Sequence, residues 1–161
     1  MKEVFDFVEM TIPAKPEYVG VVRLTVSGVA NRMGFNYEEI EDVKVALSEA
    51  CTNAVHHAYQ DDEDGEIKIG FGVYEDRLEL MVSDSGKSID LNGIKKKLGP
   101  VSTDTPVDHL TEGGLGLFLI DTLMDKVELT SEAGVVVLMT KFLERDEVED
   151  SVDTISAPQQ N

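Results

Sequence analysis

Three polar side chains recur at every fourth position in one part of the chain. Glu49, Asn53 and His57 follow this spacing, which places them on one face of a helix. There the amide oxygen of Asn53 can serve as a hard ligand for Mg²⁺, and Glu49 can accept a proton from an attacking hydroxyl. The alternative is a solvated polar face, which the pattern alone favours because most Glu and Asn side chains on amphipathic helices are exposed.

An aspartate comes at the end of a predicted strand, in the stretch Val82-Ser83-Asp84-Ser85-Gly86. Gly86 permits a close backbone approach or a positive φ. A buried carboxylate in this position can accept a hydrogen bond from the exocyclic amine of adenine, which is a base-specific contact. Asp-x-Gly is also common in ordinary turns, so the motif indicates a function only in the company of other nucleotide-binding residues.

A glycine-rich stretch, Gly113-Gly114-Leu115-Gly116, precedes the apolar spacing of a short helix. Backbone without side chains, followed by a helix, can direct amide groups at phosphate oxygens with the helix dipole behind them. The alternative is that the glycines form a hinge for the preceding loop. Phosphate binding and a hinge are compatible if that loop closes over a nucleotide. The chain has no G-x-x-x-x-G-K-[ST], H-R-D or D-F-G, so neither a P-loop NTPase nor an ordinary protein kinase is indicated.

The elements that must position these residues follow from apolar periodicity. Alternation near the N-terminus predicts a strand that ends at Pro13. Spacings of three and four then predict a helix between Pro16 and Gly34. A second helix, with Asn36 as its cap and Glu39 completing a capping box, carries the polar face described above.

The second half of the chain predicts the rest of a sheet. Alternating residues at 67–73 and 78–82 predict a hairpin, and a further pair of strands is expected at 126–131 and 135–142. The segment 87–112 lacks periodicity, which is typical of a functional loop or lid. This order of elements predicts an α+β fold, a two-layer α/β sandwich with helices on one face of a mixed, mostly antiparallel sheet.

Composition narrows the class of protein. A length of 161 residues fits one domain. The formal net charge of −18 repels the phosphate backbone of DNA and RNA, so we expect no nucleic-acid partner. No apolar run approaches the roughly 18 residues of a membrane span. The N-terminus lacks the pattern of a signal peptide, and the one cysteine, Cys51, cannot form an internal disulfide. We therefore expect a cytoplasmic protein without membrane attachment, in which Cys51 has a packing role.

The acidic excess is concentrated partly at the C-terminus. Residues 144–161 carry many charges and few apolar side chains, a composition typical of disorder. We expect a folded domain at 1–145 and a disordered acidic tail at 146–161.

Taken together, the motifs resemble those of a known superfamily. Glu49-Ala50-Cys51-Thr52-Asn53-Ala54, Asp84-Ser85-Gly86 and Gly113-Gly114-Leu115-Gly116 are similar to the N, G1 and G2 boxes of the histidine-kinase-like (GHKL) ATPases, in the same order and spacing. The stretch from Asn53 to Tyr59 resembles more narrowly the bacterial anti-sigma-factor serine kinases of general-stress partner switching. The resemblance covers residues 5 to 143.

The resemblance implies a Bergerat-type sandwich that binds ATP and Mg beneath a lid. It implies phosphorylation of a serine on a small anti-anti-sigma protein, sequestration of a sigma factor, and a homodimer. At the matching positions Glu49 corresponds to the catalytic base, Asn53 to the magnesium ligand and Asp84 to the residue that reads adenine. The nucleotide-contacting positions correspond to Gly86, Gly113, Gly114, Leu115 and Gly116.

Two departures from the family pattern concern the base pocket. Ser88 stands where the G1 box often has a second glycine, and Val135 and Val136 stand where many relatives carry threonines. These differences affect contacts to the base and leave the fold prediction unchanged.

Two other functions remain open at this point. A binding module could use nucleotide only to stabilise a sequestering conformation, and such a module has no need of a carboxylate at Glu49. The detached ATP-binding domain of a sensor histidine kinase is the other reading. It lacks support because no additional helical hairpin presents a phospho-accepting histidine, and His56 and His57 lie on the proposed ATP helix.

Overall fold

The computed structural model describes residues 6–61, 65–84, 99–100, 114–130 and 136–143. None of the helices in these ranges combines the length and the apolar character that a bilayer span needs. The elements are β1 (Asp6–Pro13), the 3-10 turn η1 (Pro16–Tyr18), α1 (Val19–Met33), α2 (Tyr37–Asp61), β2 (Glu66–Val73), β3 (Arg77–Ser83), β4 (Gly99–Pro100), α4 (Gly114–Leu123), β5 (Lys126–Thr130) and β6 (Val136–Phe142).

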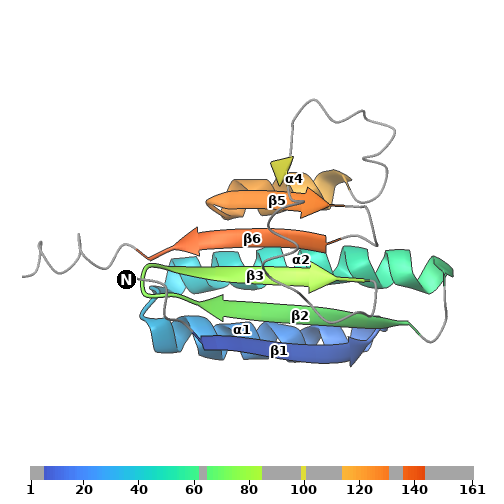
Figure 1. Ribbon diagram of the computed structural model, residues 1–161, viewed down its shortest axis with the longest axis horizontal. Helices are drawn as coiled ribbons and strands as arrows, with labels where there is room; N and C mark the ends of the chain where they lie inside the picture. Colours follow the sequence, from blue (N-terminus) through green and yellow to red (C-terminus); the bar gives the residue numbers. More distant parts are fainter. Residues whose placement is uncertain (1–5, 62–64, 85–98, 101–113, 131–135, 144–161) are drawn as a thin grey trace, which may run out of the picture.

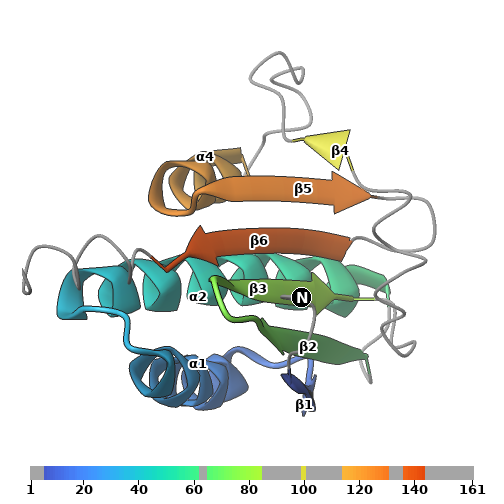
Figure 2. The same ribbon diagram turned by 60° about the vertical axis from the view of Figure 1, so that its left-hand side comes forward.

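The described strands form one sheet in the order β1-β2-β3-β6-β5-β4. Figures 1 and 2 show α1, α2 and α4 together on one face of this sheet. The predicted two-layer α/β sandwich is therefore confirmed. Every pairing between the described strands is antiparallel, which suits a sheet with helices on one face only.

α1 begins and ends as its sequence predicts. Pro16 opens η1, where its missing N–H costs no hydrogen bond. Gly34 follows the helix with φ 100°, in the left-handed region that glycine adopts without strain. The buried face of α1 carries Val19, Val22, Val26, Ala30 and Met33.

A reciprocal pair of hydrogen bonds caps α2. The backbone N–H of Glu39 donates to Oδ1 of Asn36 at 2.8 Å, and the backbone N–H of Asn36 donates to Oε1 of Glu39 at 3.0 Å. This is the predicted capping box, which satisfies two amides that the helix leaves free. α2 then continues for 25 residues, and its apolar side chains, among them Val43, Leu47 and Ala50, enter the core. The helix is therefore a rigid support for Glu49 and Asn53.

The core lies between the helices and the inner face of the sheet. Alternate residues of the central strands point into it and are buried: Ile67, Ile69, Phe71, Leu78, Leu80, Val82, Val137 and Met139. Cys51 of α2 is buried in the same core, and this burial raises the pKa of its thiol to about 12. The expected packing role of Cys51 agrees with this position.

The structure differs from the sequence prediction at one short strand. The short strand β4 lies within the segment predicted as a loop, and Gly99 and Pro100 pair with Leu129 and Glu128 of β5. The rest of 87–112 lies outside the described residues, as does the predicted tail at 146–161. The other predicted strands and helices are confirmed to within a few residues at their ends.

Candidate functional site

The first turn of α4 lies directly against the polar face of α2. A Cβ atom placed on Gly116 would come within 2.9 Å of Nδ2 of Asn53 and 3.2 Å of Oε2 of Glu49. Because 2.9 Å is shorter than real Cβ contacts, any larger residue at position 116 would require α4 or the end of the Asn53 side chain to shift. The structure thus brings Glu49, Asn53 and Gly116 into one cluster, as predicted for residues of one site.

The glycine-rich stretch opens α4 and does not simply precede it. The helix begins at Gly114, so Gly114 and Gly116 both belong to its first turn, whereas the sequence predicted these glycines before the helix. The first amides of a helix have no partner within the helix, and the dipole makes this end favourable for anions. A phosphate-binding function of this turn is consistent with its position beside Asn53. Gly113 and the side chain of Leu115 lie outside the described residues.

Asp84 directly follows β3, one of the central strands. Its side chain is half-buried, and its Oδ2 atom is shielded from solvent. In Figure 1 β3 ends on the side of the molecule toward which α2 runs and from which α4 starts. The predicted base-reading carboxylate therefore lies at the same end of the sandwich as the α2 and α4 cluster. Gly86 lies outside the described residues.

A side-chain hydrogen bond links α1 to α2 one residue before Glu49. Nε of Arg23 donates to Oγ of Ser48 at 2.9 Å, and Ser48 donates in turn to the carbonyl of Lys44 at 2.7 Å. This chain of contacts helps to fix α2 relative to α1. Sequence reasoning missed it, because Arg23 and Ser48 lie on separate helices and no local pattern relates them.

The donor set of the cluster suits a magnesium ion that arrives with phosphates. In the part of the chain that the structure describes, no group of three or more His, Cys, Asp and Glu side chains could hold a metal. Mg²⁺ commonly keeps several waters and uses one or two protein oxygens together with substrate phosphates. Asn53 offers one such oxygen, the Oδ1 atom of its side-chain amide. These residues therefore fit a magnesium-bound nucleotide.

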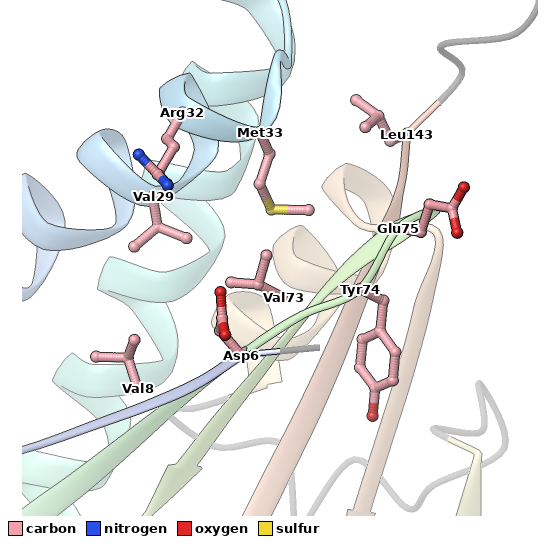
Figure 3. A pocket seen from close by; sticks show the side chains of 9 residues that line it. All are labelled: Asp6, Val8, Val29, Arg32, Met33, Val73, Tyr74, Glu75 and Leu143. Carbon is pink, nitrogen blue, oxygen red and sulfur yellow. The ribbon is translucent and has the colours of Figure 1, made fainter. Parts of the chain in front are cut away.

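A separate cavity lies away from these residues. Its volume is about 260 Å³, and it is bounded by the C-terminal part of α1, the start of β1 and the turn between β2 and β3 (Figure 3). Its lining includes Met33, Val73 and Leu143 but none of the predicted site residues. It lies at the start of β3, whereas Asp84 follows the end of that strand. The cavity is therefore distinct from the candidate nucleotide site.

Comparison with known proteins shows the family of this chain. The model of the histidine kinase-like ATPase domain matches residues 12–141, a range that contains every predicted site residue. The chain is 58% identical over 155 residues to the serine-protein kinase RsbW of Oceanobacillus iheyensis, with 96% of this chain and 98% of the relative covered. It is 59% identical to the RsbW of Halalkalibacterium halodurans, with 96% and 94% covered.

A solved structure supports the fold. The RsbU and RsbW domains of a Mycobacterium tuberculosis protein superpose with a TM-score of 0.59 at 18% identity, over 85% of this chain and 32% of that longer chain. At this identity the likeness concerns the fold alone. With 155 of the 161 residues matched, the similarity to the Oceanobacillus relative also extends into the segment after residue 143, beyond the range on which the motif resemblance rests.

Proposed function

We propose, on the premise that this chain belongs to the histidine kinase-like ATPase family, that it is a serine-protein kinase of the GHKL type that uses ATP and Mg. The observation that carries this proposal is the contact of Gly116 with both Glu49 and Asn53. It puts a carboxylate, a carboxamide oxygen and the first amides of a helix within one small volume. The names of the relatives with 58% and 59% identity, both serine-protein kinases, support the same activity.

Each residue of the cluster has a separate role in this proposal. Asn53 holds the metal through its amide oxygen, and the first turn of α4 orients phosphate oxygens with its amides. When bound, ATP would supply the phosphoryl group with ADP as the leaving group, and the magnesium ion would neutralise part of the phosphate charge. Glu49 accepts the proton of the attacking serine hydroxyl, which comes from the protein substrate.

Asp84 gives the site its preference for adenine. A carboxylate that accepts a hydrogen bond from the exocyclic amine distinguishes adenine from guanine, which presents a carbonyl at that position. The shielded Oδ2 atom of Asp84 supports this role, because a hydrogen bond protected from water discriminates better than an exposed one. Gly86, Gly113, Gly114 and Leu115 complete the nucleotide contacts in this proposal.

The protein partners follow from the resemblance to anti-sigma-factor serine kinases. The substrate is a small anti-anti-sigma protein phosphorylated on serine, and the chain also sequesters a stress sigma factor, as in the anti-sigma-B group. It acts in the cytoplasm as a homodimer, with 1–145 as its folded domain and an acidic tail after it. The net charge of −18 favours partners that present a basic surface.

The alternative is a nucleotide-regulated binding module that sequesters its partner without phosphotransfer. It would need the nucleotide contacts but no base. The position of Glu49, beside Asn53 and against the first turn of α4, favours the kinase because this carboxylate would have no function in mere binding.

A labelling experiment separates the two. The protein is incubated with Mg and ATP labelled on the γ-phosphate, together with the small cytosolic proteins that co-purify with it, and a parallel sample contains a chelator. We expect magnesium-dependent label on a serine of a small protein. Release of free phosphate alone would indicate an ATPase, and ATP-dependent retention of a partner without any label would indicate the binding module.

A further inference from the structure

A lysine lies in a row of β6 side chains that otherwise enters the core. Val137 and Met139 are buried there, and side chains alternate along a strand, so Lys141 points to the same, helical side of the sheet. Its side chain is half-buried, and its Nζ donates to the backbone carbonyl of Leu123 at 3.0 Å. Leu123 is the last residue of α4. Lys141 therefore joins the sheet to the far end of the helix whose first turn lies against Asn53.

This hydrogen bond suits the C-terminal end of α4. The last four carbonyls of a helix have no partner within the helix, and the negative end of its dipole is favourable for a cation. A lysine can also pack its apolar stem along a core while its ammonium group reaches a polar atom. Helix capping alone thus explains why Lys141 is tolerated at a core-facing position. A role in the site requires that the position of α4 depends on this bond.

Two further hydrogen bonds hold the turn after α4 to the same part of β6. The backbone N–H of Asp125 donates to the carbonyl of Thr140 at 2.9 Å, and the backbone N–H of Phe142 donates to Oδ2 of Asp125 at 2.7 Å. Together with the bond from Lys141 to Leu123 they form the α4 clasp. Three successive residues of β6 therefore hold the end of α4.

The clasp differs in kind from the packing of α4 on the core. Figures 1 and 2 show α4 alongside β5 on the helical side of the sheet, and the helix packs mainly against α2 through apolar side chains such as Ile120, which is fully buried. Burial of apolar surface is non-directional, whereas a hydrogen bond weakens steeply when it is stretched or bent. The clasp therefore resists a small slide or rotation of α4 along α2 more strongly than the apolar packing does.

A small slide of α4 would change the geometry at its first turn. α4 has ten residues, and a helix of this length is a rod of about 15 Å, so a displacement at Leu123 moves Gly114 by a similar amount. The first turn already lies tightly against α2, because a Cβ on Gly116 would come within 2.9 Å of Nδ2 of Asn53. The amides of this turn therefore keep their place beside Asn53 only if the other end of the helix stays fixed.

We infer that Lys141 is a positioning residue for phosphate binding. By holding the carbonyl of Leu123 it fixes α4 along its axis, and it thereby places the first amides of the helix where they meet the phosphates of the nucleotide. Lys141 acts through α4 and does not itself contact the nucleotide. This inference rests on the proposed function of the first turn of α4 and adds a residue at the opposite end of the helix to it.

The test compares the affinities of the full chain for ATP and for adenosine, measured in Mg by titration calorimetry. Adenosine carries the base that Asp84 is proposed to read but no phosphate, so the ratio of the two affinities measures what the phosphates contribute. Lys141→Met keeps the apolar stem and removes the donor. We expect this ratio to fall by roughly tenfold or more, because loss of one hydrogen bond to a charged group costs about that much. The adenosine affinity should stay unchanged, and Lys141→Arg, which keeps a cationic donor, should retain most of the ratio.

Val26→Ala is the matched control for a general loss of stability. Val26 is fully buried on α1, so this variant loses core packing but keeps every bond of the α4 clasp, and its ratio should equal that of the wild type. Thermal unfolding shows whether each variant is folded. If Lys141→Met does not fold, Asp125→Ala takes its place, because Asp125 is exposed and its carboxylate accepts another bond of the clasp. This variant should lower the ratio as well.

The outcomes separate this inference from the proposed function. A wild type that binds ATP no more tightly than adenosine would contradict the proposed phosphate binding itself. A folded Lys141→Met, or Asp125→Ala in its place, that keeps the ratio of the wild type would overturn the positioning role and leave the proposed function standing. An equal fall of the ratio in Val26→Ala would show that the ratio follows general stability, which would also overturn the positioning role.

Discussion

Gly116 of α4 and Asn53 of α2 lie so close together that a Cβ on Gly116 would come within 2.9 Å of the amide nitrogen of Asn53. The two residues belong to helices that pack against each other, and Glu49 approaches the same point at 3.2 Å. This contact joins the helix end suited to phosphate binding to the side chains suited to metal binding and proton transfer.

Gly116→Ala should impair phosphoryl transfer while the fold survives. The new methyl group must push α4 away from Asn53 or turn the amide aside, and misplacement of reacting groups by about 1 Å can reduce a rate on the order of 10²-fold. Steady-state transfer to the protein substrate measures the effect. Thermal unfolding should show little loss, because alanine suits a helix better than glycine.

Gly28→Ala is the matched control for this variant. Gly28 lies on α1 with nothing within 4 Å of its ideal Cβ. Replacement there should leave transfer unchanged and stabilise the protein by about 0.5–1 kcal/mol through helix propensity. If both variants retain full activity, the packing at Gly116 has no part in catalysis.

Asn53→Ala should abolish the contribution of magnesium to ATP affinity. Loss of a residue that merely supports a metal ligand costs about tenfold to a hundredfold in metal affinity, and loss of a ligand should cost at least as much. Titration calorimetry with ATP, with and without Mg, measures the difference. The affinity of the variant in Mg should match that of the wild type in chelator, and a full magnesium effect in the variant would exclude Asn53 as the ligand.

Asp84→Asn should weaken the preference for ATP over GTP. The substitution can turn an N–H donor toward the exocyclic amine, and a mismatched buried hydrogen bond costs about 1–3 kcal/mol, or roughly tenfold or more in relative affinity. Competition between the two nucleotides measures this preference. An unchanged preference in the variant would remove Asp84 from base recognition.

The buried thiol of Cys51 should make stability fall at alkaline pH. Burial raises its pKa from 9.0 to about 12 in the folded chain, so between these values the unfolded chain has lost a proton that the folded chain retains. The resulting stabilisation is fully present below pH 9 and is lost as pH rises toward 12. The free energy of unfolding in denaturant, measured at pH 8 and pH 10.5, should fall more in the wild type than in Cys51→Ala. Equal falls would show that Cys51 does not titrate as its burial implies.

The parts of the structure that depend on neighbours in sequence could be predicted from the sequence. Asn36 and Glu39 cap α2 because their spacing alone lets each reach the other's amide. Gly34 ends α1 because few other residues adopt its positive φ. The spacing from Glu49 to Asn53 likewise determines that both lie on one face of α2.

The parts of the structure that depend on tertiary contacts could not be predicted from the sequence. No local pattern relates Gly116 to Asn53. The low helix propensity of glycine led to the prediction that α4 begins after these glycines. In the structure the helix packs against α2 and begins at Gly114. The pairing of Gly99 with Leu129 arises from sheet geometry far along the chain. Only the family resemblance supplied the expectation that the three motifs meet.

Glu49→Gln is the variant that addresses the central claim, that this chain is a kinase with Glu49 as its base. The amide keeps the shape of the side chain but cannot accept the proton of the serine hydroxyl, and removal of a general base typically costs about 10²–10⁴-fold in rate. ATP binding, measured by calorimetry in Mg, should remain close to that of the wild type and shows that the site is intact.

The most direct measurement is the single-turnover rate at which the γ-phosphate label of ATP passes to serine of the protein substrate, with Glu49→Gln and the wild type side by side. We predict normal ATP binding by Glu49→Gln with a transfer rate lower by about 10²-fold or more. A transfer rate equal to that of the wild type would contradict the assignment of Glu49 as the catalytic base.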